Sequence, residues 1–187
     1  MLLDREGLLR AFRALDEELE RDKTRADVFV VGGAAMAVAY DTRRSTSDVD
    51  AVFVPTAEVR AAARRVAERL DLDVDWLNDG AKAFVPGNDP DKSNVFEGKY
   101  LQVAAASPRF LLAMKLLASR VERDQDDIRE LYRLCGFTTA EEGLQVVAAA
   151  YPSRIIPPRT RFMLEEMFPA IERRGNDREG PDRGMGL

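Results

Sequence analysis

The chain has 187 residues, of which 45% are apolar and 33% are charged, and its formal net charge is −5. This length and apolar content suffice for one compact domain, or a domain and a half, with a substantial core. The single cysteine and the lack of histidine exclude soft-ligand metal sites and histidine-based acid–base mechanisms. The modest negative charge gives no global basic character, so that any RNA contact would have to use a local patch.

The sequence contains no signal-peptide pattern and no apolar run of 18 residues. We therefore expect a soluble, cytoplasmic protein with no membrane partner. Cys135 lies in an apolar, helical context, and we expect it to be a small buried side chain and not a redox centre.

Residues 4–22 predict an amphipathic helix, because leucines and a phenylalanine repeat on one stripe with charges opposite. Such a helix most often covers a core, although it can also bind a partner. The run 28–31 predicts a strand, Gly32-Gly33 a sharp turn, and residues 34–39 a short helix. The glycines would let a ligand approach the backbone amides at the start of that helix.

A second strand follows the polar loop and carries Asp48 and Asp50 on one face, with Val49 on the other. Two neighbouring carboxylates repel each other, so they are poor candidates for a purely structural role. A bound Mg²⁺ ion would resolve the repulsion, since it accepts oxygen ligands from one or two carboxylates and keeps positions for substrate phosphates. An edge strand with two solvated aspartates is the alternative, and Asp-x-Asp alone would favour it.

The combination of a hydrophobic residue, Gly32-Gly33, 14 further residues and Asp48-x-Asp50 resembles the signature of DNA polymerase beta-type nucleotidyltransferases. The longer pattern also resembles the small bacterial nucleotidyltransferase toxins of the AbiEii and MenT types, on Arg44, Thr46, Asp48 and Asp50. The resemblance implies magnesium-dependent transfer of a nucleotide from an NTP, often a pyrimidine such as CTP, to the 3′ end of tRNA. It also implies a cognate antitoxin protein as a partner.

After this unit, Thr56 is expected to cap a helix over residues 57–70. Residues 71–75 alternate acidic and apolar side chains, which predicts a strand. Related enzymes commonly take a third carboxylate from a neighbouring strand, so Asp75 is the first candidate for a further metal ligand and Asp79 the second. A solvated loop is an equally good interpretation of this segment. Trp76 could stack on a base, but a single tryptophan in a small domain is more often part of the core.

Residues 86–92 predict a loop, and 93–96 with 99–105 predict a hairpin around Gly98. Ser107 and Pro108 predict a helix start. The following helix, to residue 120, is apolar nearly all round except for Lys115, which must extend to solvent or meet an anion.

The resemblance implies that Lys115 is a functional lysine that touches the triphosphate. Asp124 and Asp127 are three residues apart and therefore share a helix face. The resemblance implies here a carboxylate that closes the site or pairs with the lysine, and we assign this role to Asp127. Acids at the start of a helix, favoured by the helix dipole, are the simpler interpretation of Asp124 and Asp126.

A helix capped by Thr138 or Thr139 is predicted to run to Ala150, and a last helix from Pro157-Pro158 to about 173. Four side chains of this last helix are expected to pack, namely Phe162, Met163, Met167 and Phe168. The composition of residues 174–187 predicts a disordered tail.

Together these patterns predict an α+β fold, in which a small mixed sheet forms a nucleotidyltransferase core packed by helices. We expect the core over residues 1–106, an all-helical C-terminal lobe over 107–173 and the tail over 174–187. The expected phosphate contacts come from backbone amides, hydroxyls and cations, at Gly32, Gly33, Arg43, Arg44, Thr46, Ser47 and Lys115. A protein-modifying nucleotidyltransferase and a non-catalytic binding protein with the same fold remain alternatives.

Overall fold

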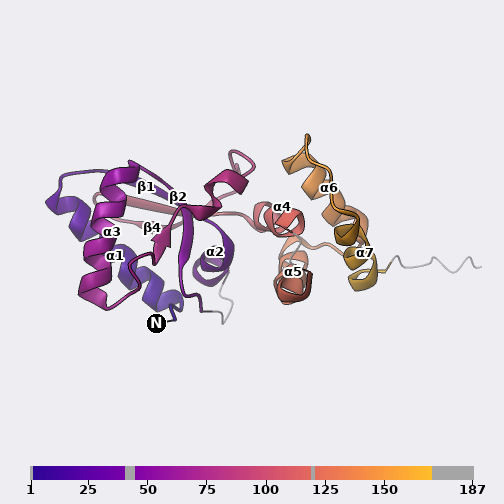
Figure 1. Cartoon of the computed structure of the whole chain (residues 1–187), viewed down its shortest axis with the longest axis horizontal. Coiled ribbons are helices and arrows are strands. Elements are labelled where there is room, and N and C mark those ends of the chain that lie inside the picture. The colour runs from indigo at the N-terminus through magenta and orange to yellow at the C-terminus, as the bar shows by residue number, and fades with distance from the viewer. Residues whose placement is uncertain (1, 41–44, 119–120, 170–187) are drawn as a thin grey trace, which may run out of the picture.

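The computed structural model describes residues 2–40, 45–118 and 121–169, without the side chains of 121–123 (Figure 1). The sheet-bearing part contains α1 (Arg5–Arg21), β1 (Ala26–Val30), α2 (Gly32–Ala39), β2 (Val49–Val54), α3 (Thr56–Leu70), β3 (Leu77–Asn78), the 3-10 helix η1 (Gly80–Phe84), β4 (Ser93–Glu97) and β5 (Leu101–Ala105). Four helices follow, α4 (Pro108–Ala118), α5 (Val121–Cys135), α6 (Ala140–Ala150) and α7 (Pro158–Met167).

The five strands form one mixed sheet in the order β3-β2-β1-β5-β4. The central strand β1 pairs antiparallel with β2 and parallel with β5. At the two edges, β3 pairs parallel with β2, and β4 pairs antiparallel with β5. This mixed sheet with its surrounding helices confirms the predicted α+β class.

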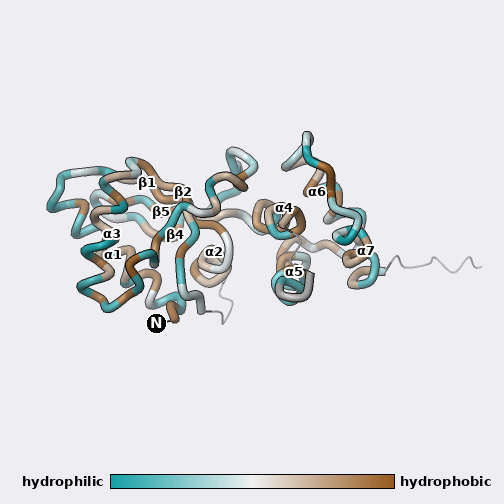
Figure 2. Tube along the Cα trace, viewed as in Figure 1, coloured by the Kyte–Doolittle hydropathy of each residue, from teal (hydrophilic) through white to brown (hydrophobic). Residues whose placement is uncertain are grey.

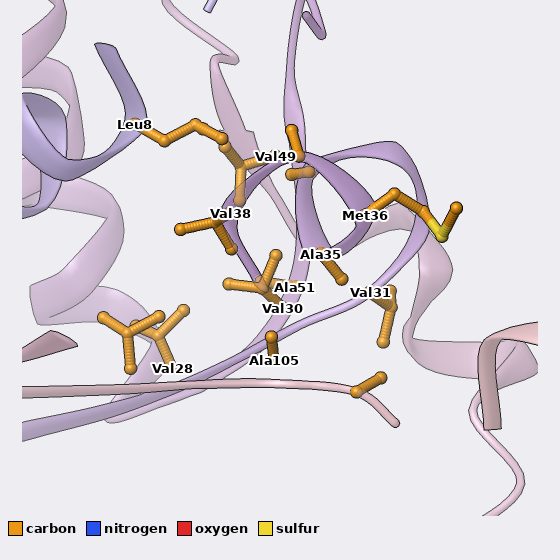
Figure 3. Packing of buried hydrophobic residues seen from close by; sticks show 14 of the residues in the cluster. Leu8, Val28, Val30, Val31, Ala35, Met36, Val38, Val49, Ala51 and Ala105 are labelled. Carbon is orange, nitrogen blue, oxygen red and sulfur yellow. The ribbon is translucent and has the colours of Figure 1, made fainter. Parts of the chain in front are cut away.

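One face of the sheet is covered by α1, α2 and α3. Alternate residues of β1 and β2 are buried on this side, since side chains along a strand point to opposite faces. Figure 3 shows Val28, Val30 and Ala51 from these strands packed beside Val38 of α2 and Leu8 of α1. Along α1 and α3, hydrophilic and hydrophobic segments alternate in Figure 2, as expected for helices with one buried stripe.

The opposite face of the sheet is more open. The other residues of β2, Asp50, Val52 and Val54, point to this side, and Val54 is 55% exposed. A shallow groove of about 490 Å³ runs over this face between Phe29 and Gln102. The site described below lies where this open face meets the helices that follow β5.

Helices α4 to α7 pack against one another beside the sheet, with α4 nearest to it (Figure 1). The Phe110 ring of α4 makes an edge-on contact with Phe29 of β1, with 5.5 Å between ring centroids. The buried apolar side chains form one cluster that continues from the sheet into these helices. The division into a core and a lobe at residue 106 stays a prediction. In the described part of the chain, no helix has both the length and the apolarity needed to span a membrane.

The start of α4 is fixed by a buried carboxylate. Asp89 is 3% exposed, and it accepts hydrogen bonds from the Ser107 backbone N–H at 2.7 Å and from the Ser107 hydroxyl at 3.0 Å. The Ser107 hydroxyl oxygen in turn accepts a hydrogen bond from the Phe110 N–H, so the predicted cap is confirmed. Asp89 thus joins the loop before β4 to the helix that carries Lys115.

Most predicted elements are confirmed to within a few residues, including the β4–β5 hairpin and the Thr139 cap, which forms a capping box with Glu142. The last helix is shorter than predicted, since α7 ends at Met167 and not near residue 173. The predicted strand over 71–75 is wrong. Asp71 adopts a left-handed conformation at the end of α3, and the Asp73 carboxylate accepts a hydrogen bond from the Asp75 N–H, which makes a turn. The strand at this edge is β3, which begins two residues after Asp75.

Four further predictions about single side chains can be compared with the structure. Thr56 is the first residue of α3 and Pro55 its cap, so the predicted cap is displaced by one residue. Phe162 is 67% exposed and does not pack, since it lies on the outer side of α7. Trp76 is fully buried and donates its indole N–H to the Ala63 carbonyl, which confirms the core interpretation. Cys135 is only partly buried, less than predicted, and this burial raises its pKa to about 11, consistent with an inert thiol.

Replacing Asp89 by alanine should destabilise the fold by about 2–3 kcal/mol, because the buried Ser107 N–H and hydroxyl would lose their acceptor. Thermal or urea unfolding measures this loss. Asp91→Asn is the matched control, since Asp91 is exposed and two residues away. Equal stability of Asp89→Ala and Asp91→Asn would contradict the anchoring role.

Candidate active site

The site begins at the junction of β1 and α2. Gly32 is the first residue of α2 and has a φ of +62°, a left-handed conformation that side chains other than hydrogen disfavour. The preceding Val31 N–H donates to the Asp50 carbonyl at 2.9 Å, which ties the turn to β2. A methyl group at Gly32 would lie 3.4 Å from Oδ2 of Asp50, so the carboxylate stands directly beside the glycine backbone.

Asp50 is partly buried on the open face of the sheet, whereas Asp48 is exposed and lies one residue before β2. The pairing of β2 with β3 places Asn78 beside Asp50 on the neighbouring strand. The side-chain oxygen of Asn78 accepts a hydrogen bond from the Gly80 N–H at 3.0 Å. The position beside Asp50 therefore carries an amide and not a third carboxylate.

Thr46 and Ser47 both contact Asp48, and Thr46 also lies near Gly33. A methyl group at Gly33 would lie 3.6 Å from the Thr46 hydroxyl oxygen. That hydroxyl donates to the Asp48 carbonyl at 2.8 Å, and the Ser47 hydroxyl donates to Oδ1 of Asp48 at 3.2 Å. Each hydroxyl has one proton and can donate one hydrogen bond, and both hydroxyls donate theirs to Asp48. Thr46 and Ser47 therefore orient Asp48 in this structure.

Asp75 and Asp79, the two candidates for a third carboxylate, do not form a metal-binding group with Asp48 and Asp50. Asp75 is exposed in the turn before β3. The carboxylate of Asp79 pairs with Arg60 of α3 at 2.6 Å, and this arginine lowers the pKa of Asp79. Arg43 and Arg44 lie outside the described residues. Within the described ranges, no group of three or more potential metal-ligating side chains comes together.

Lys115 is held between two carboxylates of α5. Its Nζ lies 3.0 Å from Oδ1 of Asp124 and 2.6 Å from Oδ2 of Asp127. The three side chains are only 13–16% exposed, whereas Asp126, between the two acids, is 86% exposed and points away. The anion that Lys115 meets in this structure thus comes from the chain itself. We refer to Lys115, Asp124 and Asp127 as the lysine clamp.

A cleft of about 660 Å³ brings the glycine turn and the lysine clamp together. One side is formed by Gly32, Gly33 and Asp50, and α4 with Asp124 of α5 forms the next. The far side is made by η1 and by the segment after α6, with Gly80, Ala81, Phe84, Tyr151, Arg154 and Ile155. The cleft has the size of an ordinary small-ligand site and combines apolar walls with a few charged groups.

Several of these residues were missed by reasoning from the sequence. Asp124 was assigned to the helix dipole, although its spacing from Asp127 indicates a shared face. Asn78 was not among the candidates, because the neighbouring strand was expected over residues 71–75, which would not place Asn78 beside Asp50. Phe84, Tyr151 and Arg154 lie in segments with no recognisable motif, and only the folding of the chain brings them together.

A fold with a Gly-Gly turn beside strand carboxylates is of the kind used to bind nucleotide phosphates. The model of a family described as a nucleotidyltransferase of unknown function, DUF6036, matches residues 6–138, which is more than half of the chain. The chain belongs to this nucleotidyltransferase family. The match includes the glycine turn, both aspartates and the whole lysine clamp, and it ends before α6. No curated protein and no solved structure matches the chain.

Gly32→Ala should lower the free energy of unfolding by about 1–2 kcal/mol, because alanine disfavours the left-handed conformation. Gly33→Ala is the matched control, because Gly33 does not have this conformation and its methyl group would make an ordinary contact. This control should be as stable as the unmodified protein or slightly more stable. Urea unfolding of both variants compares them, and equal losses would refute the special role of Gly32.

Lys115→Met should destabilise the protein by about 2–4 kcal/mol, because two largely buried carboxylates would remain side by side without their cation. Adding Asp127→Asn to this variant should restore part of the stability. The double-mutant cycle, measured by denaturant unfolding, should give a coupling of at least about 1 kcal/mol. Strictly additive changes would mean that the clamp contributes no net interaction.

Proposed function

We propose that this protein is a magnesium-dependent nucleotidyltransferase that adds nucleotides to the 3′ end of tRNA, as a toxin of a toxin–antitoxin pair. The observation that carries the enzymatic part is the carboxylate of Asp50 beside Gly32, in a cleft that also contains the lysine clamp. Membership in a nucleotidyltransferase family supports the reaction class. The acceptor and the toxin role rest on the resemblance of the aspartate motif to the AbiEii and MenT types.

The donor atoms around Asp50 fit a magnesium ion. Asp50 on β2 and Asp48, one residue before it, offer carboxylate oxygens, which are hard ligands. Magnesium commonly uses one or two carboxylates together with substrate phosphates. The missing side chain at Gly32 leaves room beside Oδ2 of Asp50 that a Cβ would fill. Asp75 remains a proposed third ligand from the sequence, but its place in an exposed turn gives it no support, whereas Asn78 lies next to Asp50.

Asp48 and Asp50 would hold the magnesium, which would supply positive charge for the nucleotide phosphates and make the attacking hydroxyl more acidic. The chain's own residues would do the rest. The free amides at the start of α2, at Gly32 and Gly33, would donate hydrogen bonds to phosphate oxygens. Thr46 and Ser47 would hold Asp48 in position through the hydrogen bonds that they already donate to it.

Lys115 would neutralise charge that develops on the leaving pyrophosphate. Its Nζ is directed at Asp124 and Asp127, so a phosphate has to compete with these carboxylates for it. Asp127 would therefore act through Lys115 and set its position. Arg43 and Arg44, which lie outside the described residues, are proposed as further cations for the phosphates.

The decisive experiment incubates the purified protein with Mg²⁺, each labelled NTP in turn and total tRNA. Label on the 3′ end of tRNA, lost with EDTA, is the expected result, with pyrimidines such as CTP the first donors to examine. Label on protein would mean that the acceptor is a protein and not tRNA, as for antitoxins that adenylylate a toxin. No label under any condition would leave a binding protein and end the enzymatic proposal. A small neighbouring reading frame would be the first place to look for an antitoxin.

Asp50→Asn should fold normally and lose nucleotidyl transfer by at least about 100-fold, because the amide is a far weaker magnesium ligand. Initial rates of label incorporation measure the loss, and circular dichroism checks the fold. Asp126→Asn, which changes an 86% exposed carboxylate on α5, is the matched control and should keep full activity. Full turnover by Asp50→Asn would refute the assignment of the metal site.

A further inference from the structure

Two large apolar side chains are exposed at the mouth of the cleft. Phe84 of η1 is 61% exposed, and Ile155, after α6, is 92% exposed. Single exposed apolar residues are common on protein surfaces. These two line the same cleft, however, from segments about 70 positions apart in the sequence, and together with Tyr151 they form an apolar rim.

The rim is a defined structure because the two segments are joined. The Tyr151 hydroxyl donates a hydrogen bond to the Phe84 carbonyl at 2.5 Å, across 67 positions of the chain. Burial raises the pKa of Tyr151 to about 12, so its hydroxyl keeps the proton that it donates at neutral pH. The ring of Phe84 stays available to a ligand while its backbone is held.

Charged groups lie next to this rim in the same cleft. Arg154 belongs to the rim segment, and Lys115 and Asp50 also line the cleft. A ligand in the cleft therefore meets apolar and aromatic surface from η1 and the segment after α6, and the glycine turn, Lys115 and Asp50 from other elements. This combination of groups suits a nucleotide, which has a flat base and charged phosphates.

We propose that Phe84, Tyr151, Arg154 and Ile155 form a subsite for an unpaired nucleobase. This inference rests on the proposed function in that it assigns the glycine turn and Lys115 to the phosphates. The base belongs either to the incoming nucleotide or to the terminal nucleotide of a single-stranded acceptor, since both present the same flat face. Three of the four residues lie beyond residue 138, outside the family match, so this subsite adds a specificity element to the chemistry that the family shares.

The test uses 2-aminopurine, whose fluorescence is quenched when the base stacks on an aromatic ring. One probe is 2-aminopurine riboside triphosphate, and the other is a short single-stranded RNA that ends in 2-aminopurine at its 3′ end. Each is titrated with the full-length protein in the presence of Mg²⁺. The variants are Phe84→Ala and Ile155→Ala. The matched control is Phe162→Ala, which removes an exposed phenylalanine that is outside the cleft.

The unmodified protein should quench at least one probe, and Phe84→Ala should weaken that binding by about tenfold and relieve the quenching. Ile155→Ala should cause a smaller loss, and Phe162→Ala none. An effect on the triphosphate probe assigns the subsite to the donor base, and an effect on the RNA probe alone assigns it to the acceptor. Unchanged binding by Phe84→Ala and Ile155→Ala, equal losses with Phe162→Ala, or failure of both probes to bind would overturn the subsite.

These measurements record binding and need no turnover. If the subsite binds a probe through Phe84 while no label is ever transferred, the transferase proposal fails and the base subsite stands. If transfer depends on Asp50 while Phe84→Ala leaves probe binding unchanged, the transferase proposal stands and the subsite is wrong.

Discussion

The placement of the Asp50 carboxylate beside Gly32 is the feature on which the rest of this site depends. A left-handed residue at the start of α2 turns the chain away from β1, and the Val31–Asp50 hydrogen bond holds the turn against β2. Because Gly32 has no side chain, an acidic group and the amides at a helix start lie within the same small space. Those two features have opposite electrostatic preferences, and a cation together with phosphates satisfies both.

The chemistry and the shape of the cleft come from different parts of the chain. The glycine turn and the two aspartates belong to the first half of the sequence, and the lysine clamp is supplied by α4 and α5. The position of α4 depends in turn on the buried Asp89, which fixes its first turn. Asp89 therefore helps to set the position of Lys115, because both are joined to the same rigid helix, α4.

Much of the fold could be predicted from local patterns, since apolar periodicity and helix caps such as Ser107 act over a few residues. The glycine–aspartate motif was also visible, because its spacing is fixed by a strand, a turn and a strand. The turn over residues 71–75 could not be predicted, because its alternating aspartates look like a strand in the sequence. In the structure the Asp73 carboxylate instead bonds the nearby backbone. The far side of the cleft, made by η1 and the segment after α6, could not be predicted for another reason. Its position depends on how elements distant in the sequence pack together.

The hydrogen bond from Tyr151 to Phe84 has a consequence for how ligands enter and leave. It is exposed to solvent, and a bond of this kind contributes only about 0.5–1.5 kcal/mol. It therefore holds the two segments less strongly than the buried contacts that hold α4 to α6 and α7. Loss of this one bond would separate the two walls of the cleft without any unfolding of the helices, so the width of the entrance depends on a single phenol.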